Sequence, residues 1–145
     1  MASSKRQQII DAVATLLSDA ANPNGQIVAT KMRSIAVGTT EAAAYSVYKI
    51  HEQVTPIGSK FGTLKSRLLT LAIKLQVNGD DEALDPHEQW ALAQVLKDRT
   101  LGGLAIDTQE TDTEWEGVEG TDTNATSAIV TFTVEYRTLL ADLTQ

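Results

Sequence analysis

Four acidic residues at alternate positions come nearest to a catalytic pattern in this sequence. They are Glu110, Asp112, Glu114 and Glu116. An extended strand would place all four on one face, with neighbouring side chains ~7 Å apart. Paired carboxylates at such a spacing can serve a glycosidase. However, four like charges in a row, with no histidine beside them, are more typical of a water-facing surface, so no catalytic residue is predicted here.

Other catalytic and ligand-binding patterns are also missing. The chain has no cysteine, which excludes thiolate nucleophiles, disulfides and zinc–thiolate sites. His51 is expected on a strand and His87 exposed in the first turn of a helix, and neither has a second ligand at zinc spacing. The acids of residues 80–85 lack the spacing of a calcium loop. Gly102-Gly103 follows a helix, whereas a phosphate site needs glycines that open one. The sequence therefore predicts no enzyme, no metal and no cofactor.

The composition is that of an ordinary globular protein. The chain has 145 residues, of which 42% are hydrophobic and 21% charged, so we expect one domain over residues 1–145 with its own core. No apolar run approaches the ~18 residues of a membrane span, and the first residues do not read as a secretory signal. These features predict a soluble, intracellular protein.

Charge is unevenly distributed along the chain. The net charge is −7, a sign that argues against duplex binding. Residues 107–122 contain seven acids and no base, which accounts for the whole excess, whereas residues 31–74 contain seven bases and two acids. Two oppositely charged segments favour association between copies, although both could also be solvated surfaces. The candidate interface residues are Lys31, Arg33, Lys60, Phe61, Lys65, Arg67, Glu110, Asp112, Glu114, Glu116 and Glu119.

Two helices are predicted from periodicity and capping. The first begins after Ser4 and carries apolar residues at helical spacing as far as Ala20. The second begins with Asp85 as its cap and Pro86 at the first helical position. We expect that helix to end at the Leu101-Gly102-Gly103-Leu104 turn.

Alternating residues predict the strands. A short extended piece is expected over Met32–Val37, and β-branched and aromatic residues predict a strand over 45–54 followed by a loop over 55–62. Apolar residues alternate with polar ones over 69–77 and 128–137, and a further strand is expected over 104–115. The order helix, three strands, helix, two strands predicts an α+β fold. Its single, mostly antiparallel sheet of about four to five strands carries the two main helices on one face.

The order of elements resembles that of the tail terminator proteins of long-tailed bacteriophages. The resemblance runs from Ser4 to about Asp142. It is carried by the long strand over 64–77, the helix that leads into Thr100-Leu101-Gly102-Gly103-Leu104, the acidic strand after it, and the final strand Phe132-Thr133-Val134-Glu135-Tyr136-Arg137. These motifs are structural and have no catalytic content.

The resemblance implies a structural virion protein that assembles in the host cytoplasm. Such a protein forms a ring of six copies on the last ring of the tail tube, stops polymerisation and presents a surface to the head–tail connector. DNA passes through the lumen without specific binding, and no membrane is involved. The loops 38–43 and 55–63, which include Phe61, are candidate contacts with the tube or the connector.

Several alternatives remain open from the sequence. The acidic strand is either a subunit interface or a wall of the lumen that repels DNA phosphates. The chain could also be another neck or head–tail joining protein, a small cytosolic adaptor, or, least favoured, a carboxylate-dependent enzyme.

Overall fold

The computed structural model describes residues 4–18, 23, 27–30, 43–57, 64–79, 81–118 and 125–139. The elements in these ranges are α1 (Lys5–Leu17), β1 (Ile27–Thr30), β2 (Ala43–Ile57), β3 (Leu64–Asn78), α2 (Asp81–Leu96), β4 (Asp107–Val118) and β5 (Ala125–Leu139). Helix, three strands, helix and two strands follow in the predicted order. The extended piece expected over Met32–Val37 lies outside the described residues, and the strand before β2 is β1.

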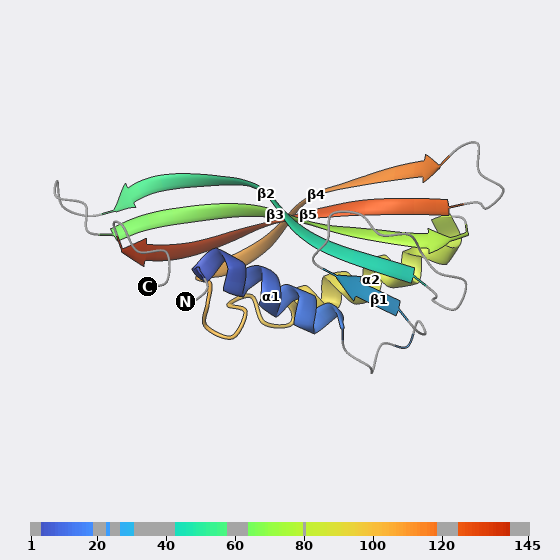
Figure 1. Cartoon of the computed structure of the whole chain (residues 1–145), viewed down its shortest axis with the longest axis horizontal. Helices are drawn as coiled ribbons and strands as arrows, with labels where there is room; N and C mark the ends of the chain where they lie inside the picture. Colours follow the sequence, from blue (N-terminus) through green and yellow to red (C-terminus); the bar gives the residue numbers. More distant parts are fainter. Residues whose placement is uncertain are drawn as a thin grey trace.

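The strands form one sheet in the order β1-β2-β3-β5-β4. Strands β2, β3, β5 and β4 are antiparallel to their neighbours, whereas β1 is parallel to β2. Both helices lie against the same face of the sheet (Figure 1). This arrangement confirms the predicted α+β fold, with a mostly antiparallel sheet and two helices on one face. The opposite face is called the open face below.

The core lies between the helices and the sheet. Strand alternation in β3 and β5 directs one set of side chains to the helices, as the period of two predicts. That set is Leu69, Leu71, Ile73 and Leu75 from β3 with Val130, Phe132, Val134 and Tyr136 from β5. The helices complete the cluster with Ile9, Val13 and Leu17 from α1 and Leu84, Ala91 and Val95 from α2. Burial of these apolar side chains is the main source of stability.

Helix α1 begins as predicted and ends at Leu17. The Ser4 hydroxyl accepts a hydrogen bond from the Gln7 amide at 3.2 Å, which satisfies one of the free donors at a helix N-terminus. The helix ends at Leu17, where the Ser18 amide donates to the Thr15 carbonyl. The predicted extension to Ala20 lies outside the described residues.

The predicted limits of helix α2 were wrong at both ends. It begins at Asp81, one turn before Asp85, and Pro86 lies inside it. The earlier start buries Leu84 fully under the sheet, and this burial offsets the one backbone hydrogen bond that a proline within the second turn removes.

Helix α2 ends at Leu96 because the next residues form a separate turn. The Asp98 carboxylate accepts hydrogen bonds from the Thr100 hydroxyl and from the Thr100 and Gly102 amides at 2.6–3.0 Å. These bonds lower the pKa of Asp98. Three consecutive residues, Leu101, Gly102 and Gly103, have φ between +50° and +91°, a region that glycine adopts at little cost. The turn reverses the chain and delivers it to β4.

Strand β2 is longer than predicted. Residues 55–57, expected in a loop, continue the strand and pair with residues 64–66 of β3. Pro56 is compatible with this because, among the described residues, β2 is an edge strand at that point, and edge strands tolerate proline. The β2–β3 hairpin therefore runs past the N-terminal end of α1 (Figure 1).

His87 is buried, which corrects the prediction that it is exposed. Its side chain is 5% exposed, and its Nδ1 atom lies 2.5 Å from the Tyr45 hydroxyl of β2. The Tyr45 and His87 rings meet edge to face with centroids 5.7 Å apart. Burial lowers the pKa of His87, so the imidazole is neutral in the folded protein at neutral pH. His51 lies exposed on β2, in the predicted strand.

This burial makes stability depend on pH. The unfolded chain binds a proton at His87 near pH 6.5 and the folded chain only at lower pH, so the free energy of unfolding should fall as pH decreases below about 6.5. We expect a smaller fall between pH 7.5 and 5.5 in His87→Gln, measured by urea denaturation. His51→Gln is the matched control and should behave as the parent chain does. Equal pH dependence in His87→Gln and the parent chain would contradict the assignment.

Candidate interaction surface

The acidic strand β4 divides its carboxylates between two faces. The register of β4 against β5 shifts between Glu110 and Asp112, and this bulge changes which side of the sheet the following residues face. Glu110 lies opposite Phe132, which faces the helices, whereas Asp112 lies opposite Thr131 on the open face. The prediction that the four alternating acids share one face was therefore wrong.

The three acids after the bulge lie exposed on the open face. They are Asp112, Glu114 and Glu116. Strand β4 pairs with β5 alone among the described strands, so its outer edge offers backbone donors and acceptors to another chain. Negative charge on such an edge discourages indiscriminate pairing and favours a basic partner.

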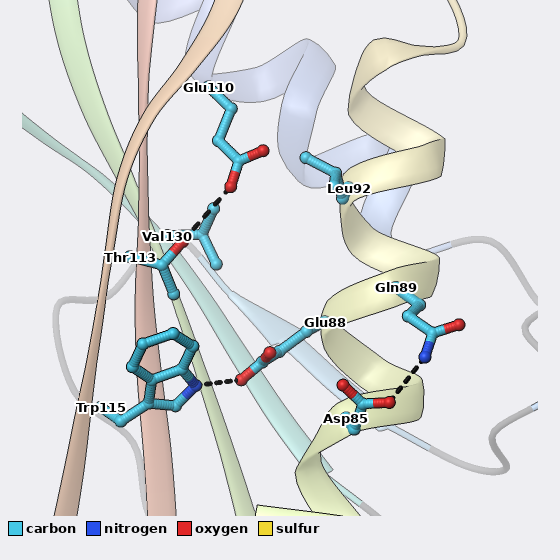
Figure 2. Close-up of a pocket in the computed structure, with 8 residues that line it drawn as sticks. All are labelled: Asp85, Glu88, Gln89, Leu92, Glu110, Thr113, Trp115 and Val130. Carbon is cyan, nitrogen blue, oxygen red and sulfur yellow. Dashed lines mark hydrogen bonds between the residues drawn. The ribbon is translucent and has the colours of Figure 1, made fainter.

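A groove separates β4 from α2 on the helix side of the sheet (Figure 2). Its volume is about 240 Å³, and it is lined by Asp85, Glu88, Gln89, Leu92, Glu110, Thr113, Trp115 and Val130. The Trp115 side chain is 60% exposed, and its indole N–H donates to Glu88 Oε1 at 2.6 Å. The groove therefore combines an aromatic wall, an apolar floor and three carboxylates.

Acidic residues from both elements gather at this corner of the molecule, called the acidic end below. Its members are Glu82, Asp85 and Glu88 from α2 with Glu110, Asp112, Glu114 and Glu116 from β4. The described bases in the same half of the sheet, Lys49 and Lys74, lie on β2 and β3 and not on β4. The α2 members were not among the predicted interface residues, because a linear segment does not show which helix lies beside an edge strand.

Bases gather at the other end of the strands, called the basic end below. Its members are Lys5 and Arg6 from α1, Lys65 and Arg67 from β3, and Arg137 from β5. The register brings them together, since Ser66 pairs with Arg137 and Arg67 with Tyr136, while the Lys5 ammonium donates to the Arg137 carbonyl at 3.0 Å. Lys5, Arg6 and Arg137 lie far from residues 31–74 in sequence, so the segment comparison missed them.

One predicted interface residue, Arg67, is engaged inside its own subunit. Its guanidinium donates to Glu52 Oε2 at 2.9 Å and to the Thr138 hydroxyl at 2.8 Å, and its side chain is only 14% exposed. Glu52 also lies 3.5 Å from the Arg6 guanidinium and accepts a hydrogen bond from the Tyr136 hydroxyl. Burial, together with this bond to Glu52, raises the pKa of Tyr136. Arg67 therefore stabilises the sheet under α1 and is not free to bind a neighbour.

Lys65 differs from Arg67 although it lies only two residues away. It is partly exposed and forms no hydrogen bond or ion pair with another described residue. The remaining predicted interface residues, Lys31, Arg33, Lys60, Phe61 and Glu119, lie outside the described residues. The candidate contact loop over 38–43 lies outside them except for Ala43, the first residue of β2, and so do residues 58–63 of the second loop.

The described ranges contain no group of three or more His, Asp or Glu side chains arranged to hold a metal ion. Neither described helix is both long and apolar enough to cross a membrane.

The contrast between Arg67 and Lys65 can be measured. Arg67→Glu would place a second carboxylate against Glu52 and leave the pair unbalanced, which should lower the free energy of unfolding by about 3 kcal/mol. Lys65→Glu should change it by less than about 0.5 kcal/mol. Urea denaturation of the two variants at low protein concentration checks this. Equal stability of the two would show that the Glu52 cluster is not a structural ion pair.

No protein-family model and no curated protein matches the chain. Among solved structures, a chain from the virion of a native gene transfer agent particle aligns with it at 13% sequence identity and a TM-score of 0.44. The alignment covers 93% of this chain and 92% of that chain. A likeness of this size does not assign the chain to a family.

Proposed function

We propose that this chain is a structural, non-enzymatic virion protein whose copies associate head to tail into a ring. In this proposal the ring closes the head-proximal end of a phage tail tube, stops its polymerisation and meets the head–tail connector. The ring of six and the virion partners are what the sequence resemblance implies. The mode of association is argued from the geometry.

The observation that carries the proposal is the separation of charge along the strands. The basic end and the acidic end are different surfaces of one sheet: the bases lie near residues 64–67 of β3, and the acids run from the middle of the sheet, at Glu110, toward its other end. When one patch of each copy binds the other patch of the next copy, the contact is heterologous and closes into a ring or continues as a filament. A two-fold dimer in which each patch met its own counterpart would bring like charges together.

The outer edge of β4, which has no described neighbour, also supports head-to-tail association. A capping ring must contact its neighbours without offering an indiscriminate site for further strands. Acids along β4 meet this need, because a basic neighbour neutralises them and another acidic edge is repelled.

The bulge in β4 allows the two roles considered for the acidic strand to coexist. Glu110 faces the groove beside α2, where a neighbouring subunit can bind, and the other three acids occupy the open face. If the open face lines the lumen, Asp112, Glu114 and Glu116 repel the phosphates of the passing DNA, which carries one negative charge per ~1.7 Å of duplex.

Self-association and its dependence on charge provide the first test. We expect purified protein to form a species of about six times the 15.6 kDa chain mass in light scattering at low salt, and to dissociate as salt is raised because exposed charges are screened. Lys65→Glu should weaken the assembly about tenfold. The matched control is Lys97→Glu, an equal charge change at an exposed residue just after α2. A monomer at all concentrations, or equal effects of the two variants, would contradict the proposal.

The virion role is tested by electron microscopy of particles assembled with the gene silenced. We expect over-long tubes without heads beside filled heads, since an uncapped tube continues to grow. Normal tails of fixed length would overturn the terminator assignment and favour a different neck protein or an adaptor.

A further inference from the structure

We propose that the groove between α2 and β4 is the binding site for the hairpin end of a second copy of this chain. The hairpin end is defined here as residues 54–57 of β2 with residues 64–67 of β3. Its Lys65 ammonium would enter the groove between Glu88 and Glu110, with its alkyl stem along Trp115. The proposal rests on head-to-tail association and names the two surfaces that make the contact.

The chemistry of the groove suits a lysine side chain. Leu92, Val130 and the Trp115 ring supply apolar surface, and Figure 2 shows the indole and the Glu110 carboxylate both directed toward α2. A lysine combines a four-carbon stem with a charged tip, so it can cover apolar surface while its ammonium reaches carboxylates. The face of a tryptophan also attracts a cation within about 6 Å of its centroid.

The Trp115 ring is already held in place. Its N–H bond to Glu88 links the exposed β4 side chain to α2. An aromatic side chain fixed before binding loses little conformational freedom when a partner arrives. Exposed tryptophans with such restraint are typical of the residues that dominate interface energies.

The carboxylates of the groove lack a described cation. Asp85 bonds to the Gln89 amide at 2.6 Å, and Glu110 accepts from the Thr113 hydroxyl at 3.3 Å. The ion pairs among the described residues involve instead Glu52, with Arg6 and Arg67, and Asp107, with Arg99. The groove therefore presents negative charge that a cation from another molecule can compensate.

The hairpin end carries the complementary features. Lys65 has no partner among the described residues, and Val54, which lies on the same face of the hairpin, is 43% exposed. The helices do not cover this end, because the hairpin runs past α1 (Figure 1). A lysine without a partner in the described part of the chain, next to an exposed apolar side chain, matches an acidic groove with an apolar floor.

The open face of β4 is a less favourable binding site for the same lysine. Asp112, Glu114 and Glu116 are exposed on it, and no described helix or aromatic side chain lies beside them. Glu110 and Glu114 thus lie on one strand with opposite orientation, which provides a matched pair for mutation.

The test exchanges the charges of the two surfaces in the full-length chain. Glu110→Lys and Lys65→Glu should each weaken association about tenfold in analytical ultracentrifugation, and the double variant should recover to within about threefold of the parent chain. Glu114→Lys, the matched control, should weaken association less and should not be rescued by Lys65→Glu. Trp115→Ala should cost about 30-fold. All four side chains are at least partly exposed, and thermal melts verify that each variant is folded.

The outcomes separate this inference from the one on which it rests. If the parent chain is monomeric at every concentration, head-to-tail association fails and the groove contact fails with it. Suppose instead that the parent chain assembles, but Glu110→Lys and Glu114→Lys weaken association equally or the double variant is not restored. Head-to-tail association is then retained, and the groove is not the contact site. Assembly that survives Trp115→Ala unchanged would likewise overturn the groove assignment.

Discussion

The uninterrupted antiparallel pairing of β3 with β5 is the constraint on which the rest of the structure depends. The two strands match over their full lengths, from Leu64 with Leu139 to Asn78 with Ala125. Because the side-chain period is two, a slip of one residue would turn the buried set of both strands to solvent. The same register decides that Arg137 lies beside the hairpin end.

Irregularities lie in the strands that flank this pair. Register shifts occur in β2 between Lys49 and His51 and in β4 between Glu110 and Asp112, whereas the β3–β5 pairing has none. An extra residue near an edge costs few contacts and redirects the side chains after it. In β4 it turns Asp112, Glu114 and Glu116 to the open face and leaves Glu110 on the groove side. In β2 it lets Glu52 face Arg67 across the helix side, where the ion-pair cluster forms.

Neighbouring residues of the basic end serve different purposes for a physical reason. Arg67 and Glu52 are mostly buried under α1, and a buried charge without its partner is costly, so this pair maintains the fold. Lys65 lies one strand repeat further out, where solvent screens it and no partner is required. The acidic end shows the same division, because Glu88 restrains Trp115 while Glu110 has only a neutral partner. The residues proposed to bind another copy are thus those that form no ion pair with a described residue of their own chain.

Local patterns in the sequence determined the α+β class, the first turn of α1 and the positions of β3 and β5, because helix capping and apolar alternation involve residues only a few positions apart. Only tertiary structure decided the remainder. His87 is buried because Tyr45, 42 residues away, lies over it. Helix α2 begins one turn earlier than predicted because this start buries Leu84 beneath the sheet. The bulge at Glu110 depends on how β4 pairs with β5, and the charged ends depend on strand register. Counting charges along the chain indicated that two oppositely charged patches exist. Which residues belong to each patch is decided by the folded sheet.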